Sequence, residues 1–137
     1  MKAILFVDDE PWYHESIRYS LESRGYKCLV AADMSTALEM LSVNEVAVVV
    51  TDIMMPAGKD YPQIDSQETG FHLINKLRGE HPQTAIVCLS VIGNEAKIRP
   101  LRSMQIEYLR KGEVPLARVI QTIERAARDG GQRTWRL

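Results

Sequence analysis

The chain has 137 residues, 45% of them hydrophobic, and a formal net charge of −1 at pH 7. This length suits one domain with one core, and so weak a net charge gives no argument for binding nucleic acid or a membrane surface. No apolar stretch is long enough to span a bilayer, and the apolar run at the start reaches two aspartates after five residues, too soon for a signal peptide. We therefore expect a cytoplasmic protein.

Strands and helices alternate about five times along the sequence. We expect strands at 2–7, 27–31, 46–51, 84–90 and 107–109. The expected helices run from Pro11 to Gly25, after Asp33, from about 70 to 78, from 94 to 104, and from Pro115 to Asp129. This alternation predicts an α/β fold in which helices cover both faces of one parallel sheet.

Helical spacing predicts which side chains face the core. The expected inward residues are Tyr13, Ile17, Leu21, Ala37, Leu38, Leu41, Phe71, Ile74, Leu77, Leu116, Val119, Ile120, Ile123 and Ala127. Pro100 should kink or shorten the fourth helix. We interpret the three histidines as surface or boundary residues, and Cys28 and Cys88 as buried thiols rather than ligands or a disulfide.

Polar residues follow four of the predicted strands. Asp8 and Asp9 end the first, Asp52 ends the third, and Ser90 and Lys111 end the fourth and fifth. Because ligands bind at the carboxyl ends of strands in open α/β sheets, these groups should share one edge. Carboxylates 4 Å apart repel by about 4 kcal/mol per pair at an effective dielectric near 20, so the cluster needs a positive partner. A divalent metal and a lysine are the candidates.

In these segments the chain resembles the receiver domain of two-component response regulators, such as the chemotaxis receivers. The matching stretches are Phe6-Val7-Asp8-Asp9-Glu10-Pro11, Thr51-Asp52-Ile53-Met54-Met55-Pro56, Leu89-Ser90 and Tyr108-Leu109-Arg110-Lys111. The resemblance implies a single flavodoxin-like (βα)5 domain over residues 1–128, with five parallel strands in the order 2-1-3-4-5. A tail of residues 129–137 would follow it.

The resemblance also implies a function. Asp52 would accept a phosphoryl group from a histidine kinase or phosphotransfer protein in a Mg²⁺-dependent reaction. Asp9 and Asp52 would bind the metal directly, Asp8 largely through water, and Met54 through its backbone carbonyl, which suits the preference of Mg²⁺ for oxygen. Lys111 would contact a phosphoryl oxygen. Such a chain is a signalling domain rather than an enzyme, although it promotes its own phosphorylation and dephosphorylation.

The resemblance places a switch beside this site. Ser90 would donate a hydrogen bond to the phosphoryl group, and Tyr108 would turn inward in response, which shifts the population between two surface states. The output is altered binding of a downstream protein target. Homodimerisation is left open. In isolation, Asp9 could be only a helix cap, Ser90 a strand-end hydroxyl, Lys111 a solvated surface residue and Tyr108 ordinary edge packing.

Three features depart from the family pattern. Residues 57–69 form a long polar loop, interpreted either as a tolerated surface insertion or as a lid or kinase-selecting element. Val91 stands where the family generally has a smaller residue, which predicts slow reaction with small phosphodonors. Gly112 replaces the proline that usually follows the lysine, so the turn should loosen and leave Lys111 less rigidly placed.

Two further classes of function are open to this sequence. One is a protein-interaction module that keeps the receiver fold but works without phosphorylation; the retained acidic residues and Lys111 argue against it. The other is a hydrolase with an aspartyl-phosphate intermediate. That class would place its two acids as Asp-x-Asp after the first strand, whereas this chain has adjacent Asp8 and Asp9.

Overall fold

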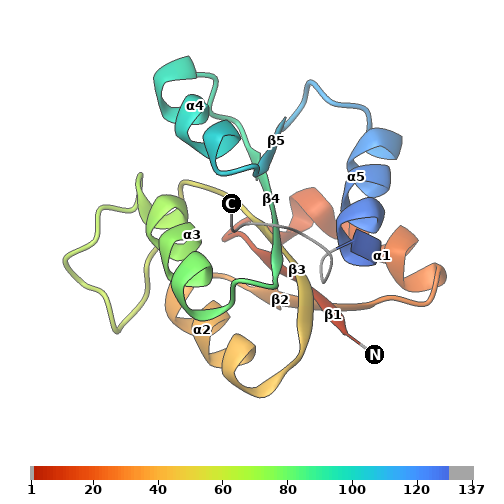
Figure 1. Cartoon of the computed structure of the whole chain (residues 1–137), viewed down its shortest axis with the longest axis horizontal. Helices are drawn as coiled ribbons and strands as arrows, with labels where there is room; N and C mark the ends of the chain where they lie inside the picture. Colours follow the sequence, from red (N-terminus) through yellow and green to blue (C-terminus); the bar gives the residue numbers. More distant parts are fainter. Residues whose placement is uncertain (1, 130–137) are drawn as a thin grey trace.

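The structure is a computed structural model that describes residues 2–129. Within that range five parallel strands form one sheet in the order β2-β1-β3-β4-β5 (Figure 1). Their bounds are β1 Ala3–Val7, β2 Lys27–Ala31, β3 Val46–Thr51, β4 Ala85–Ser90 and β5 Glu107–Arg110. The predicted α/β fold class and strand order are confirmed, and the strand ends differ from the prediction by only one residue.

Helices follow every strand and divide between the two faces of the sheet (Figure 1). Their bounds are η1 Pro11–His14, α1 Glu15–Ser23, α2 Met34–Val43, α3 Thr69–Glu80, α4 Glu95–Ser103 and α5 Leu116–Asp129. Helices α1 and α5 cover one face, and α2, α3 and α4 cover the other. Pro100 lies inside α4, which continues three residues beyond it.

Strand β1 shows how the sequence fills both faces. Ile4 and Phe6 pack with the core residues of α1 and α5, whereas Leu5 and Val7 pack with those of α2, α3 and α4. Side chains alternate along a strand, so a central parallel strand that is covered on both sides must be apolar throughout. This is why the sequence around the site reads as short continuous apolar runs.

The first helical segment differs from the prediction in phase. Residues 11–14 form a 3₁₀ helix, which has three residues per turn, before the α-helix begins. His14 instead of Tyr13 therefore falls in line with the buried Ile17 and Leu21. His14 is 1% exposed and stacks on Phe6, so its interpretation as a surface or boundary residue was wrong. Tyr13 is 37% exposed.

On the later helices most of the predicted inward residues are buried, and Leu116 and Phe71 are the clearest exceptions. Leu116 opens α5 and is exposed, because that helix reaches the core only one turn later, at Val119. Phe71 is half-buried, and Leu73 takes the buried position on α3. Of the two cysteines, Cys88 is buried and Cys28 half-buried, and both are free thiols. Burial raises the pKa of the Cys28 thiol to about 11 and that of Cys88 further still, as expected for unreactive groups.

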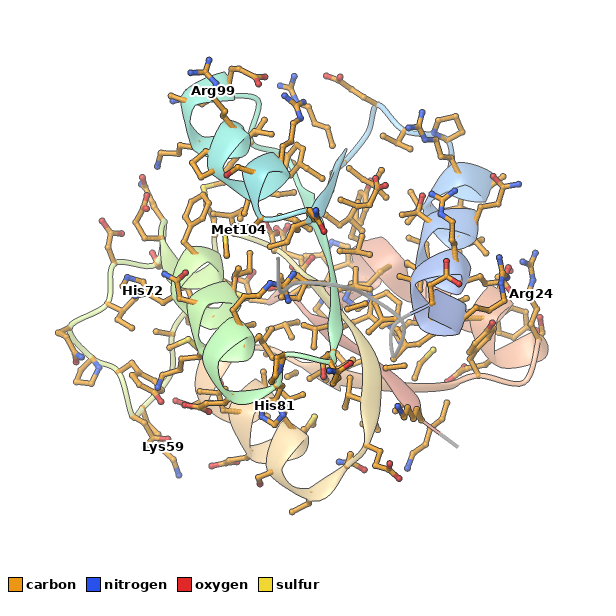
Figure 2. The ribbon with its side chains drawn as sticks, in the orientation of Figure 1. Arg24, Lys59, His72, His81, Arg99 and Met104 are labelled. Atoms are coloured by element: carbon orange, nitrogen blue, oxygen red, sulfur yellow. The ribbon has the colours of Figure 1, made fainter. Side chains whose placement is uncertain are left out.

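The inserted loop, predicted at 57–69, ends at residue 68 because α3 begins at Thr69, and it is attached to the helices beside it. Ser35 of α2 holds its start, because its backbone N–H and hydroxyl donate to the Ala57 carbonyl and its hydroxyl accepts from the Asp60 N–H. Tyr61 and Ile64 pack against the core on the α2–α3 side. Figure 2 shows Lys59 out on this loop, on the far side of α3 from the sheet. The loop is therefore a packed extension of the α2–α3 face.

Helix α5 extends one residue beyond 128, the predicted end of the domain. The predicted tail, residues 129–137, begins with Asp129, which is the last residue of α5, and its other residues lie outside the described residues. No helix within residues 2–129 is long and apolar enough to cross a membrane.

Candidate functional site

Three charged side chains from three different strand ends meet at the carboxyl edge of the sheet. The Lys111 Nζ donates to Asp8 Oδ2 at 2.7 Å and to Asp52 Oδ2 at 2.8 Å. All three side chains are buried, with exposed fractions of 3% for Lys111, 4% for Asp8 and 8% for Asp52. At this depth the ammonium group and the two carboxylates attract one another strongly, because little water screens their charges.

The backbone around Asp52 fixes its other oxygen. Asp52 Oδ1 accepts from the Ile53 N–H at 2.6 Å, while the N–H of Asp52 itself donates to the Val7 carbonyl across the sheet. The carboxylate is thus held between a backbone amide on one side and Lys111 on the other. The end of β3 therefore holds the Asp52 carboxylate in a fixed position.

Gly70 allows α3 to begin directly against the end of β3. Its N–H donates to the Ile53 carbonyl at 2.8 Å. A Cβ at position 70 would lie 2.4 Å from the Asp52 carbonyl oxygen and 2.5 Å from the Ile53 Cα, distances that side chains do not tolerate. The absence of a side chain here therefore positions Asp52, a role that the sequence pattern did not reveal.

Asp8 is held in a similar way, by a backbone amide and by Lys111. Its Oδ1 accepts from the Glu10 N–H at 2.9 Å. Burial raises the pKa of Asp8 above its usual value, and the hydrogen bond from Lys111 only partly offsets this effect. Repulsion from Asp52 acts in the same direction as burial. A further positive charge nearby would therefore favour the ionised form of Asp8.

In Lys111 the attraction of the two carboxylates outweighs the effect of burial. Burial by itself would lower its pKa, but hydrogen bonds to Asp52 and Asp8 outweigh burial and raise the pKa above its usual value. Its backbone is fixed as well, because its N–H donates to the Ser90 carbonyl at 2.8 Å. The lysine is thus a permanent cation rather than a surface residue. One positive charge faces two buried negative charges, so the group stays one charge short of neutral.

The remaining predicted metal ligands lie at the surface beside this group. Asp9 is exposed, and Met54 is 37% exposed with its N–H 3.4 Å from Asp52 Oδ1. Within residues 2–129 no three His, Cys, Asp or Glu side chains are close enough to hold a metal by themselves.

The donor set nevertheless fits Mg²⁺. This ion keeps several waters and commonly uses only one or two carboxylates. The two Oδ2 atoms already converge on one cation, the Lys111 ammonium.

The two predicted switch residues contact each other through the segment after β4. Ser90 is fully buried, and its Oγ lies 3.5 Å from the Ile92 N–H, too far for a strong hydrogen bond. The Tyr108 hydroxyl donates to the Ser90 and Ile92 carbonyls. Burial raises the pKa of Tyr108 to about 12, so the hydroxyl keeps its proton. A displacement of residues 90–92 would therefore change the hydrogen bonds of the Tyr108 hydroxyl.

Tyr13 is a second site residue that the sequence analysis missed. Lys111 Nζ lies 4.8 Å from the centre of the Tyr13 ring, and the Tyr13 hydroxyl accepts from the Gly112 N–H at 2.9 Å. The signal was hidden because helical spacing assigned Tyr13 to the core. Only the three-residue turn of η1 brings it to the mouth of the site.

The fold and the cluster of two carboxylates and a lysine agree with one class of protein. Residues 4–124 match the family model described as the response regulator receiver domain. The chain belongs to this family, whose members are signalling domains of two-component phosphorelay systems.

Among curated relatives, the chain is 30% identical over 128 residues to the response regulator GtcR of Aneurinibacillus migulanus, an alignment that covers 91% of the chain and 49% of that protein. It is 27% identical over 109 residues to the nitrogen assimilation regulatory protein NtrX of Azorhizobium caulinodans, covering 79% of the chain and 22% of the relative. The chain thus spans half or less of the length of these relatives.

Solved structures share the fold at low sequence identity. A CheY-like receiver domain from Methanospirillum hungatei superposes with a TM-score of 0.77 at 17% identity, over 96% of this chain and 98% of that one. The response regulator TrrA of Thermotoga maritima, solved in complex with Mg²⁺ and BeF, gives a TM-score of 0.72 at 22% identity over 92% and 99%. These likenesses show a common fold.

Proposed function

We propose that this chain accepts a phosphoryl group on Asp52 from a histidine kinase or phosphotransfer protein, in a Mg²⁺-dependent reaction. The observation that carries the proposal is the Asp52 carboxylate, buried at a strand end with Lys111 Nζ 2.8 Å from one of its oxygens. A carboxylate is a suitable nucleophile, and the lysine lowers the repulsion between it and an incoming phosphoryl group.

The transfer is a displacement at phosphorus. An Asp52 oxygen forms a bond to phosphorus while the bond from phosphorus to the histidine nitrogen of the donor breaks. The electron pair of that bond stays on the imidazole, which takes up a proton. Lys111, released in part from Asp8 and Asp52, contacts a phosphoryl oxygen. Such catalysis consists of positioning and charge stabilisation, with no further covalent chemistry from the protein.

Mg²⁺ supplies the positive charge that the resting group lacks. Asp9, Asp52 and the Met54 carbonyl are the proposed direct ligands, and Asp8 acts largely through water. The exposed position of Asp9 beside the buried Asp8 suits a site that opens to solvent and fills from it. The negative charges of the three carboxylates equal the positive charges of Mg²⁺ and Lys111, so the resting site would be neutral. A phosphoryl group on Asp52 would add negative charge to it.

The output is a change in the surface around α4 and β5. The Ser90 hydroxyl donates to the phosphoryl group, and the segment after β4 follows it. Because the Tyr108 hydroxyl is bonded to carbonyls of that segment, the movement reaches the exposed side of β5. Binding of a downstream protein target changes as a result. A cytoplasmic location stays a prediction of the sequence, and homodimerisation stays an open question.

A receiver-like module that works without phosphate is not favoured. Such a module would gain nothing from two buried carboxylates that share one ammonium, since a matched apolar group in their place is often as stable or more so. The burial of Asp8 and Asp52 is better explained by a reaction that uses them.

Mass spectrometry of the protein after incubation with phosphoramidate tests the proposal. We expect the mass gain of one phosphoryl group, located on Asp52 and dependent on Mg²⁺. The reaction should be slow if Val91, which is 52% exposed at the end of β4, restricts access. Asp52→Asn should show no gain, and the control Asp60→Asn, on the inserted loop, should react normally. No gain in the native chain, or a gain at another residue, would overturn the proposal.

A further inference from the structure

Tyr13 contacts both the proposed catalytic lysine and the residue that follows it. Its ring lies under the Lys111 ammonium at 4.8 Å, and its hydroxyl accepts a hydrogen bond from the backbone N–H of the next residue, Gly112, at 2.9 Å. A cation beside an aromatic face is attracted by the ring quadrupole. One side chain from η1 therefore holds both the charge of Lys111 and the backbone that follows it.

The backbone of Gly112 is shaped for this contact. Its φ is +83°, a left-handed conformation that glycine adopts without strain. Proline could not replace it here, since proline fixes φ near −65° and has no N–H to donate. Residues 2–129 contain no cis peptide bond. The glycine that seemed to loosen this turn thus supplies the donor that ties the turn to Tyr13.

The contact with Tyr13 limits the movement of the Lys111 side chain. In the described state the ammonium is bound to Asp8 and Asp52, yet phosphoryl transfer requires it to move toward a phosphoryl oxygen. A long lysine side chain that loses its partners would sample many rotamers. A ring anchored at its hydroxyl end keeps the ammonium near the site during that exchange.

We propose that Tyr13 is a positioning residue that acts through Lys111 and replaces, in this chain, the rigid turn that a proline would give. The inference rests on the proposed phosphorylation of Asp52. It assigns to the Tyr13 hydroxyl and the Gly112 N–H a role in the rate of that reaction. Tyr13 itself contacts no reacting atom.

Two substitutions separate the ring from the hydroxyl. Tyr13→Phe keeps the ring and removes the acceptor, whereas Tyr13→Leu removes both. Misplacement of a catalytic group costs rate, so we expect phosphorylation by phosphoramidate to slow about 3- to 10-fold in Tyr13→Phe and roughly 10- to 30-fold in Tyr13→Leu. Mg²⁺ affinity should stay within about twofold, because the metal ligands are untouched. Tyr19→Phe, on the exposed side of α1, is the matched control and should leave the rate unchanged.

The same substitutions in a Lys111→Met background show whether Tyr13 acts through the lysine. Residues that act together are not additive, so Tyr13→Phe should have almost no further effect once Lys111 is absent. A second measurement needs no phosphate: the NMR signals of the Lys111 ε-methylene should carry a ring-current shift that Tyr13→Leu removes.

Three outcomes would overturn the role of Tyr13. They are a native rate in Tyr13→Phe, an undiminished effect in the Lys111→Met background, and a loss of Mg²⁺ affinity as large as the loss of rate. If the native chain takes up no phosphoryl group at all, the proposed function fails and the positioning role fails with it. Phosphorylation of the native chain together with any of the three outcomes removes the positioning role alone.

Discussion

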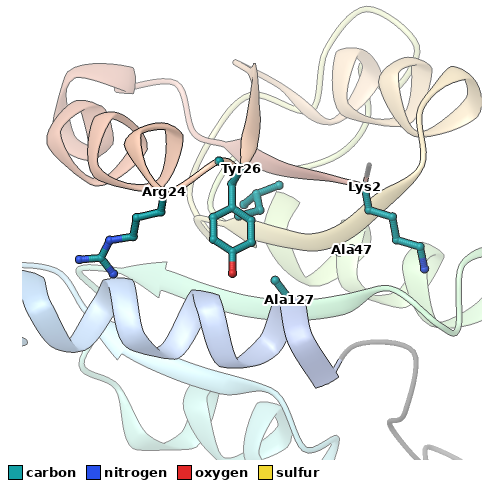
Figure 3. A pocket seen from close by; sticks show the side chains of 7 residues that line it. Lys2, Arg24, Tyr26, Ala47 and Ala127 are labelled. Atoms are coloured by element: carbon teal, nitrogen blue, oxygen red, sulfur yellow. The ribbon is translucent and has the colours of Figure 1, made fainter.

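The two ends of the parallel sheet are built from different kinds of groups. At the carboxyl end, Asp8, Asp52 and Lys111 are buried and in direct contact. At the amino end a hollow is lined by Lys2, Ile4, Arg24, Gly25, Tyr26, Ala47 and Ala127. Figure 3 shows Tyr26 pointing toward α5 near Ala127, with Lys2 and Arg24 on either side.

The hollow at the amino end is lined by few polar groups that could bind or react with a ligand. Arg24 is half-exposed and already paired with Glu124 at 2.6 Å. Mainly apolar side chains form the rest of the wall. The carboxyl end, in contrast, buries two negative charges with only one positive charge, which folding alone does not favour. The uncompensated buried charge therefore lies at the proposed functional end of the sheet, whereas the hollow lies at the opposite end.

The largest effect should come from removing the cation at the carboxyl end. Lys111→Met leaves Asp8 and Asp52 buried without their partner and removes the contact to the phosphoryl group. Phosphorylation of Asp52 should slow by about 100-fold or more, the scale seen when one charge-stabilising group is lost. Rates from a time course of intact mass would measure it. A loss below about tenfold would contradict the role given to Lys111.

Gly70 tests the support behind Asp52. Gly70→Ala places a Cβ against backbone atoms that cannot give way, so it should lower the free energy of unfolding by roughly 2–3 kcal/mol, as overpacking does. It should also slow phosphorylation. Urea unfolding and the phosphoramidate assay are the measurements.

A matched control for this substitution lies at the other end of the same helix. Gly79 has open space where its Cβ would be, and Gly79→Ala should stabilise the helix by up to about 1 kcal/mol. Equal effects of the two substitutions would show that the close contact at Asp52 is unimportant.

His14 predicts how stability depends on pH. Burial, reinforced by the nearby charges of Arg18 and Lys111, lowers the pKa of His14 to about 4. In the unfolded chain the pKa is near 6.5, so acid protonates the unfolded state first and stability falls as the pH drops from about 6.5 toward 4. The expected loss between pH 7 and pH 5 is about 2 kcal/mol.

Urea unfolding at the two pH values measures this loss. His14→Gln should remove most of the difference between them, whereas His72→Gln, on the exposed side of α3, should not. A pH dependence that survives in His14→Gln would assign it to other groups.

The smallest effect is expected at the amino end. Arg24→Gln removes an ion pair with Glu124 that is partly exposed to solvent, and such pairs contribute about 0–1 kcal/mol. Phosphorylation of Asp52 should be unchanged. A clear loss of phosphorylation in this variant would show that the hollow at the amino end is coupled to the site.

Much of this molecule could be predicted from the sequence, because the central strands are apolar runs with polar residues directly after them. That pattern gave the order of strands and helices and placed Asp8, Asp52 and Lys111 at one edge. The features that escaped it depend on local geometry. His14 is buried in place of Tyr13 because a 3₁₀ helix has fewer residues per turn than an α-helix. An argument from α-helical spacing assumes about 3.6 residues per turn throughout.

Close approach and backbone conformation were equally hidden. Nothing in the letters around Gly70 states that α3 starts against the Asp52 carbonyl. Gly112 was expected to loosen the turn. Its contact with Tyr13 could not be foreseen, because the two residues lie 99 positions apart in the chain. The inserted loop looked like a free polar segment, whereas Tyr61 and Ile64 pack it onto the core.

Calorimetric titration with Mg²⁺ and then with beryllofluoride, a mimic of the phosphoryl group, tests the central claim most directly. Our account predicts that Mg²⁺ binds to the native chain, that Asp8→Asn and Asp9→Asn weaken it, and that beryllofluoride binds only when Mg²⁺ is present. Mg²⁺ at 100 times its Kd should also stabilise the fold by about 2.7 kcal/mol. A native chain that gives no binding heat of either sign with these ligands and is not stabilised by them against unfolding would contradict the account.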